Sequence, residues 1–266
     1  MKTNQKSEVD MQETTNVTAI ELKTYDDFKT PKLDPTKWVT AKLPLGDGNY
    51  WEYYDPNTVV KTGNGRCEIT VNPFSRSHNQ IQIADNPKTL FASAEPVKIG
   101  KDDILTVSVD IAAIAHNNNR HDVYDAFITF NLFDFNSGIV LDFLLNGNLI
   151  YAFYERLFIP GVTDETTAFT RAADLAVNTR PGQFHNLIMT YDRKFDTALW
   201  IVDGQPMYRV PHMPVKVDQF LMGMGLMTLK PIAAPFPYYF PKSTSLHGQG
   251  ITGIWSNYRV GLTPNS

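Results

Sequence analysis

The side chains best suited to acid–base chemistry lie on three consecutive strand candidates between residues 125 and 157. Side chains alternate between the two faces of a strand, so each candidate divides into two faces. We predict that one face carries Asn131, Asp142 and either Glu155 or Arg156 among aromatic side chains. A face of this mixed character is typical of a ligand groove. The alternative is a face covered by residues 163–177, with Asp142 and Arg156 as an ion pair.

These residue types suggest roles if the protein is an enzyme. Asp142 or Glu155 would act as the acid or base, with His121 in support. Arg156 would orient the ligand, and Asn131 would hydrogen-bond it. His121 belongs to the loop sequence HNNNRH, so a solvated loop histidine is the alternative interpretation.

Transition-metal chemistry is not expected from this sequence. It contains 6 histidines, and none stands in a ligand spacing such as HxH or HExxH. We therefore predict no metal site in the groove and acid–base chemistry without a transition metal. Whether the protein is catalytic at all stays open at this point.

Aromatic residues form a second group of candidates, because exposed rings stack on sugars or cover apolar ligands. Trp51 and Tyr53 follow a glycine-rich turn, Tyr154 precedes Glu155, and Tyr238 lies in the proline-rich stretch 231–241. We predict that these four residues contact the ligand. The alternative for each ring is burial in the core, which is the expectation for Trp200.

The elements that position these residues are strands. Candidates recur roughly every 10–15 residues with turn signals between them, and long amphipathic helices are absent. This pattern predicts an all-β protein, an antiparallel two-sheet jelly-roll sandwich formed as a single domain by residues 23–266. Residues 1–22 are polar and predict a disordered tail. Residues 163–177 are expected to form a short helix or a loop over the sheet.

A three-stranded meander stands at the centre of this pattern. Its strand candidates are residues 185–191, 197–202 and 205–210. Asp203-Gly204 connects the last two, and this dipeptide favours a type I′ turn, in which both central residues have positive φ.

In chain order, the meander contains a glycine, an aromatic residue and a histidine, then a strand, a turn with Asp, a strand that ends in Asp-Gly, and a last strand. This order resembles the concanavalin A-like lectin/glucanase superfamily, with its laminarinase-like and laminin-G-like jelly rolls. Residues 28–38, FKTPKLDPTKW, resemble the entry segment of many glucanase-type members, which closes the first strand. The resemblance covers roughly residues 25–262 and implies a sandwich with a concave face that binds carbohydrate. Residues 150–161, IYAFYERLFIPG, also resemble an uncharacterised bacterial and fungal family of this fold.

The resemblance also limits the chemistry. Laminarinase-type glycosidases carry Glu-x-Asp-x-(x)-Glu on one strand of the concave sheet. The most similar stretch here is residues 138–144, GIVLDFL, in which only Asp142 remains. A retaining glycosidase of that type is therefore not expected. No cofactor is expected either, although Asp26, Asp27 and Asn257 loosely resemble parts of a structural calcium site of the superfamily.

Bulk properties exclude some partners. The net charge is −4, and Lys and Arg are scattered, so neither nucleic acid nor an anionic membrane is an expected partner. No signal sequence and no apolar run of about 20 residues is recognisable, which predicts a cytoplasmic protein. Cys67 is the single cysteine, and we expect a half-buried strand thiol that is not a nucleophile.

The sequence therefore predicts a ligand-binding jelly roll that binds or acts on a carbohydrate-like compound in a concave groove. The expected partner is a small molecule or an oligosaccharide. One alternative is an intracellular enzyme of small-molecule metabolism, such as an isomerase, a cyclase or a hydrolase, that uses the same groove. A second alternative is a non-catalytic module that binds another protein.

Overall fold

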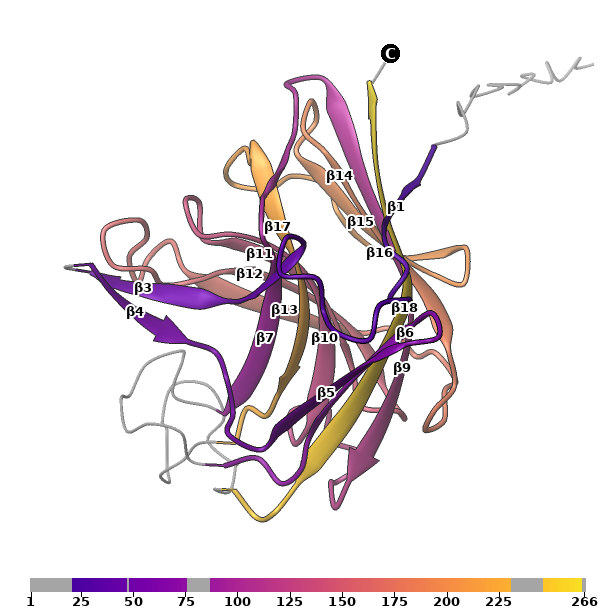
Figure 1. Cartoon of the computed structure of the whole chain (residues 1–266). Helices are drawn as coiled ribbons and strands as arrows, with labels where there is room; N and C mark the ends of the chain where they lie inside the picture. Colours follow the sequence, from indigo (N-terminus) through magenta and orange to yellow (C-terminus); the bar gives the residue numbers. More distant parts are fainter. Residues whose placement is uncertain (1–20, 47, 76–86, 231–245, 265–266) are drawn as a thin grey trace, which may run out of the picture.

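The structure is a computed structural model that describes residues 21–264 except residues 47, 76–86 and 231–245; for residues 43–46 and 51 it describes the backbone alone. Two antiparallel sheets pack face to face, as predicted (Figure 1). No helix occurs among the described residues. In that part of the chain, accordingly, no helix is long and apolar enough to span a membrane.

The first sheet contains the predicted meander at one edge. Its strand order is β16 (Gln205–Val210), β15 (Thr197–Val202), β14 (His185–Asp192), β9 (Asp103–His116), β18 (Gly250–Pro264), β6 (Arg66–Val71) and β5 (Thr58–Gly63). β1 (Lys23–Asp26) also pairs with β18. Asp203 and Gly204 have φ values of 50° and 80°, so both turn residues adopt the positive φ that was predicted.

The second sheet contains the three strands that carry the predicted acids. Its order is β13 (Phe169–Asp174), β12 (Ile150–Arg156), β11 (Ile139–Leu145), β10 (Phe127–Asp134), β17 (Gln219–Met227), β7 (Lys88–Ser93) and β2 (Trp38–Thr40). β8 (Val97–Lys98) pairs with β17. A separate hairpin of β3 (Lys42–Gly46) and β4 (Asn49–Glu52) projects on the left of Figure 1.

The prediction for residues 163–177 was wrong. Asp164 accepts hydrogen bonds from the backbone of Thr166 and Thr167 and so forms a turn. The chain then continues as β13, which pairs with β12 at the edge of the second sheet. The segment therefore extends the sheet instead of covering it, and its sequence FTRAAD was too polar to stand out as a strand.

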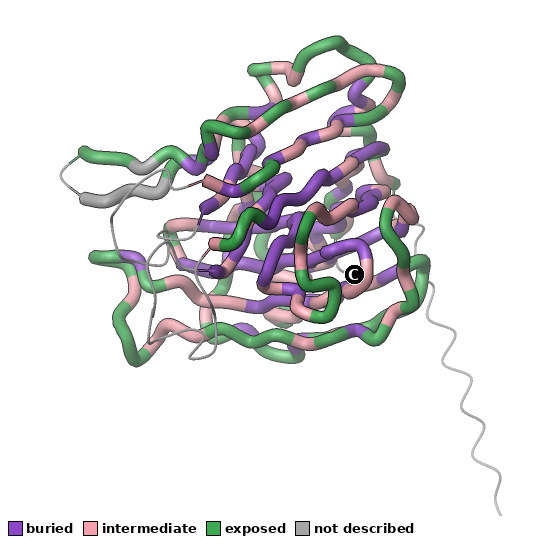
Figure 2. Tube along the Cα trace, turned by 90° about the horizontal axis from the view of Figure 1, so that it is seen from below, coloured by how far each residue is buried: buried purple, intermediate pink, exposed green. Residues whose placement is uncertain are grey.

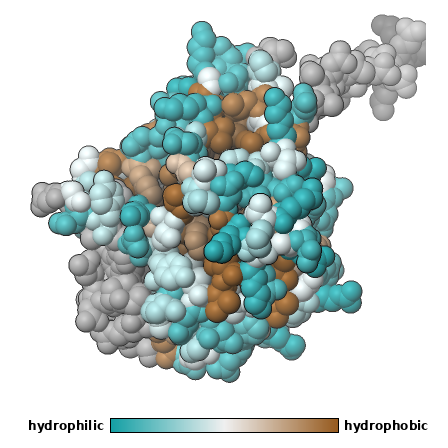
Figure 3. All heavy atoms as spheres, in the orientation of Figure 1, coloured by the Kyte–Doolittle hydropathy of each residue, from teal (hydrophilic) through white to brown (hydrophobic). Residues whose placement is uncertain are grey.

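The core lies between the two sheets. Trp200, Trp255, Tyr191 and Tyr258 are among its largest fully buried side chains, which confirms the prediction for Trp200. Cys67 is a free thiol buried in the same core. Figure 2 shows the buried strands as purple segments inside a rim of exposed loops. The surface view in Figure 3 is correspondingly dominated by hydrophilic side chains, with smaller hydrophobic patches between them.

The outer faces of the two sheets differ. β14 alternates between buried and half-buried residues, as expected for a strand with one face toward solvent. β10 and β11 are buried at every position. The outer face of the second sheet is therefore largely shielded from water, and this is the face that carries the predicted acids.

Candidate functional site

A row of polar side chains crosses the outer face of the second sheet diagonally; we call it the polar band. It consists of Thr129, Asn131, Asp142, Glu155 and Thr170. Strand register explains the diagonal, because Asn131 lies opposite Asp142 whereas Glu155 lies opposite Val140 and Thr170. The shared face of Asn131 and Asp142 was predicted, and Glu155 instead of Arg156 completes it.

Hydrogen bonds connect both ends of the polar band. The Thr129 hydroxyl donates to Asn131 Oδ1 over 2.6 Å, and Asn131 Nδ2 donates to Asp142 Oδ1 over 2.7 Å. At the other end, the Thr170 hydroxyl donates to Glu155 Oε1 over 2.7 Å. Both acids are thus held in place by neighbouring strands.

Two glycines on β17 make room for the buried end. Gly225 lies opposite Thr129, and Gly223 lies opposite Asn131. A Cβ atom at Gly225 would come within 2.5 Å of the Thr129 hydroxyl oxygen, and one at Gly223 within 3.0 Å of Asn131 Oδ1. Side chains at these positions would therefore displace the hydrogen-bonded row.

Apolar clusters flank the polar band on both sides. One contains Tyr53, Phe133 and Val140, together with Ala41, Leu90 and Ala92. The other contains Val123, Phe127, Leu144 and Phe153, with the half-buried Tyr124 and Tyr151 packed against it. The ring centroid of Tyr124 lies 6.0 Å from that of Phe153 and 6.4 Å from that of Tyr151. Hydrogen-bonding groups and aromatic rings therefore alternate across this face.

Burial along the polar band is graded. Thr129 is 0% exposed, Asn131 3% and Asp142 6%. Glu155 is half-buried, and Thr170 is exposed. The polar band is therefore most open to solvent at the edge formed by β12 and β13, and Glu155 lies nearer this edge than Asp142.

The environment raises the pKa of both carboxyl groups. Burial raises the pKa of Asp142 well above its usual value of 3.8, the charge of Glu155 adds to this, and the Asn131 hydrogen bond opposes it. Burial also raises the pKa of Glu155, against the Thr170 hydrogen bond and the Lys88 ammonium group. Two neighbouring carboxyl groups whose pKa values are both raised are typical of sites that carry out acid–base chemistry.

Lys88 lies on the same outer face as the two acids but at a distance from them in the sheet. Lys88 stands on β7, four strands away from Glu155 on β12. The Lys88 ammonium nitrogen also lies 4.9 Å from the ring centroid of Tyr53, over the same face.

Two predicted ligand residues on β12 point away from the polar band. Tyr154 lies in the core between the sheets, 2% exposed, with its ring 4.9 Å from that of Phe169. Arg156 shares the face of Tyr154 at the strand end, where its Nε donates to the main-chain oxygen of Ser137 over 3.1 Å. The alternative ion pair between Asp142 and Arg156 does not occur, because the two side chains lie on opposite faces of the sheet.

The remaining predicted residues have different positions. His121 is exposed in the loop before β10, where it accepts a hydrogen bond from Arg120 over 3.1 Å, and no described contact brings it to either acid. Tyr53 is buried beneath Lys88 in the apolar cluster. Trp51 lies on β4, but its side chain is outside the described part of the structure. Tyr238 lies outside the described residues.

Some residues at the site were missed from sequence. Tyr151 and Phe153 alternate with Glu155 on one strand, so the two-residue period already placed them on its face. Thr170 and Lys88 carried no such signal. They reach the site only because β13 and β7 join the sheet on opposite sides of the acid-bearing strands.

The residues considered for calcium have other partners. The Asp26 carboxylate accepts hydrogen bonds from the Trp38 indole over 2.8 Å and from the backbone of Phe28 over 2.9 Å. Asp27 forms an ion pair with Lys29, and the Asn257 amide donates to Asp110. The described residues contain no group of three or more His, Cys, Asp or Glu side chains that could hold a metal ion.

Solved structures share this architecture. An endo-1,3-β-glucanase from Streptomyces sioyaensis is 14% identical and has a TM-score of 0.60, with 90% of this chain and 95% of that chain covered. The laminarinase catalytic domain from Thermotoga maritima MSB8 is 14% identical, with a TM-score of 0.56 and coverage of 91% and 98%. The Emp47p carbohydrate recognition domain is 11% identical, with a TM-score of 0.52 and coverage of 92% and 97%. These likenesses define a concanavalin A-like jelly roll, as the sequence predicted.

The sequence also matches a family model over residues 25–264, nearly the whole of the described fold. The chain belongs to this family, which is described as a family of unknown function (DUF6081). A comparison with curated protein sequences finds no match.

Proposed function

We propose that the polar band binds a carbohydrate-like compound in a groove on the outer face of the second sheet. The observation that carries this proposal is the pair of Asp142 and Glu155, two acids that share one face between two apolar clusters. Removing a carboxyl group from water is costly, so the buried Asp142 beside the half-buried Glu155 supports a functional role for the pair.

The chemistry of the site fits a neutral compound with several hydroxyl groups. Glu155 would accept hydrogen bonds from ligand hydroxyls, and protonated Asp142 would donate to a ligand oxygen. The rings of Tyr124 and Tyr151 offer apolar surface for the C–H faces of a sugar. The relatives in fold include two glucanases and a carbohydrate recognition domain, which supports this ligand class without fixing it.

A second candidate function is an enzyme of small-molecule metabolism, such as an isomerase, a cyclase or a hydrolase. The raised pKa values of both carboxyl groups favour it. Asp142 would donate a proton, and Glu155, nearer the opening, would accept one from the substrate. His121 has no role in this arrangement, because its described contacts lie elsewhere.

The test is calorimetric titration of the purified protein with neutral oligosaccharides of glucose linked β-1,3 or β-1,4, and with a panel of apolar metabolites. We expect an oligosaccharide to bind and Glu155→Gln to weaken binding about tenfold or more, the scale of a lost hydrogen bond to a charged group. Glu68→Gln, on β6 of the other sheet, is the matched control and should bind like the wild type.

Three outcomes would decide between the candidates. Binding without products after long incubation supports a binding protein, and products that disappear in Asp142→Asn support the enzyme. Binding of apolar compounds alone would contradict the carbohydrate ligand and leave the enzyme of small-molecule metabolism. Absence of binding to any compound in the panel would overturn both and favour a module that binds another protein.

A further inference from the structure

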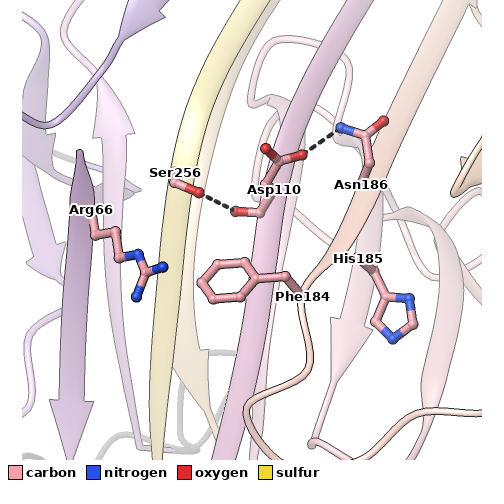
Figure 4. Close-up of a pocket in the computed structure, with 6 residues that line it drawn as sticks. All are labelled: Arg66, Asp110, Phe184, His185, Asn186 and Ser256. Carbon is pink, nitrogen blue, oxygen red and sulfur yellow. Dashed lines mark hydrogen bonds between the residues drawn. The ribbon is translucent and has the colours of Figure 1, made fainter.

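A separate pocket opens on the outer face of the first sheet, on the opposite side of the sandwich from the polar band. Its volume is about 380 Å3, and it is lined by Arg66, Asp110, Phe184, His185, Asn186 and Ser256. Figure 4 shows that these residues come from neighbouring strands and from the loop that leads into β14. Residues far apart in the sequence therefore converge on one hollow.

Asp110 on β9 is fixed at one end of the pocket by two amides. Asn186 Nδ2 donates to Asp110 Oδ1 over 2.7 Å, and Asn257 Nδ2 donates to Asp110 Oδ2 over 2.6 Å. Asn257 reaches Asp110 from an irregularity in β18 between Ser256 and Arg259, where its φ is 51°. Bulges of this kind redirect side chains and are frequent beside functional sites. The carboxylate keeps lone pairs that can accept hydrogen bonds from a ligand.

Arg66 and Phe184 form the other end. The guanidinium carbon of Arg66 lies 5.0 Å from the Phe184 ring centroid, and Figure 4 shows the ring between Arg66 and His185. Within the described part of the chain, no carboxylate forms an ion pair with Arg66. A guanidinium group carries donors in a planar fork that matches a carboxylate, and stacking on a ring restricts its orientation.

His185 is a fixed part of the wall. Its Nδ1 lies 2.7 Å from Asp203 Oδ2, and its Nε2 lies 2.9 Å from the Thr179 hydroxyl oxygen. Both ring nitrogens are occupied, and the side chain is almost completely buried. His185 therefore stabilises the loop that carries Phe184, and the polar contacts of a ligand would come from the other residues.

We propose that this pocket is a second ligand site, selective for a small monocarboxylate that also bears hydroxyl groups, such as an acidic sugar. Arg66 pairs with the carboxylate, and Phe184 packs against the apolar face of the ligand. Asp110, Asn186 and Ser256 exchange hydrogen bonds with its hydroxyl groups. The charges determine how the ligand is oriented in the pocket. Its carboxylate lies beside Arg66, because Asp110 would repel it at the other end. This site does not depend on the proposed function of the polar band.

The test is titration of the 15N-labelled full chain with D-glucuronate, D-glucose and D-glucarate, followed by NMR. We expect glucuronate to shift the amide resonances of Phe184, Asn186 and Ser256. Neutral glucose should bind at least about tenfold more weakly, because it lacks the charge-assisted contact with Arg66. Glucarate, with a carboxylate at each end, should also bind more weakly than glucuronate.

Two variants and one control make the result decisive. Arg66→Gln should lose the preference for glucuronate over glucose, and Asp110→Asn should improve glucarate binding relative to glucuronate. Arg209→Gln changes an exposed arginine on β16 of the same sheet and should leave every titration unchanged. The proposal is overturned if glucuronate at tens of millimolar shifts none of these resonances, or if Arg66→Gln binds it as tightly as the wild type.

Discussion

The outer faces of the two sheets carry the same pair of side chains in opposite surroundings. On the second sheet, the Asn131 amide donates to the Asp142 carboxylate over 2.7 Å. On the first sheet, the Asn186 amide donates to the Asp110 carboxylate over the same 2.7 Å. In both pairs the two residues lie directly opposite each other on neighbouring antiparallel strands.

The difference lies in access to water. Asn131 and Asp142 are 3% and 6% exposed, whereas Asn186 and Asp110 are half-buried beside an open pocket. Water can replace a lost hydrogen bond at Asn186 and Asp110, but it cannot do so at the buried Asn131 and Asp142. The same two side chains therefore make a hydrated polar surface on the first sheet, and on the second a buried pair in which the pKa of the acid is raised.

The largest expected effect on stability comes from removing the buried amide of Asn131. Asn131→Ala removes the donor to Asp142 and the acceptor of the Thr129 hydroxyl, and it should lower the free energy of unfolding by about 2–3 kcal/mol. Asn186→Ala should lower it by less than about 1 kcal/mol, because water reaches Asp110. Urea denaturation of both variants at neutral pH measures the difference, and equal losses would contradict the contrast between the two faces.

The next largest effect is the pH dependence of the folding stability that Asp142 causes. Because the pKa of Asp142 is raised in the fold, the folded protein keeps a proton that the unfolded chain releases above its usual pKa of 3.8. Stability contributed by this proton is present at acidic pH and is lost as pH rises through the raised pKa. Asn cannot ionise, so Asp142→Asn does not lose stability as the pH rises. We therefore expect the Tm of this variant to exceed that of the wild type by a few degrees at neutral pH.

Thermal unfolding across a pH series checks this sign. The advantage of Asp142→Asn should shrink toward pH 4, where the wild-type carboxyl group is protonated in both states. Asp110→Asn is the control on the hydrated face. If the Tm difference between Asp142→Asn and the wild type stays constant with pH, the pKa of Asp142 is not raised in the folded protein.

The smallest effect concerns the coupling of the two acids. Glu155→Gln removes the neighbouring charge that helps to raise the pKa of Asp142, so that pKa should fall. The change in unfolding free energy should stay below about 1 kcal/mol, because Glu155 is only half-buried. Carboxyl 13C NMR of Asp142 follows its titration directly, and an unchanged Asp142 curve would show that the acids act independently.

Local patterns explain what the sequence predicted well. The meander of β14, β15 and β16 followed from hydrophobic alternation and from Asp203-Gly204, whose positive φ values the structure confirms. The shared face of Asn131 and Asp142 followed from the two-residue period of side chains. Alternation also placed Tyr154 and Glu155 on opposite faces, so both could not have lined one groove.

Other features depend on which strands become neighbours, and local patterns do not encode this. β13 is a polar edge strand that is recognisable only from its pairing with β12. Lys88 is far from Glu155 along the chain, and only the order of the strands places both on one face of the sheet. The pocket on the first sheet likewise requires β6, β9, β14 and β18 to be assembled.

One hydrogen bond between the two sheets involves a tryptophan, so fluorescence can be used to observe it. Trp200 belongs to the first sheet, yet its indole N–H donates to the main-chain oxygen of Asp142 over 2.8 Å, through the core. The emission of an indole responds to the electric field around it, and the Asp142 carboxyl group is the nearest titrating charge on that strand. We therefore expect the emission of Trp200 to change when Asp142 ionises, although the indole lies in the core and the carboxyl group faces the other side of the sheet.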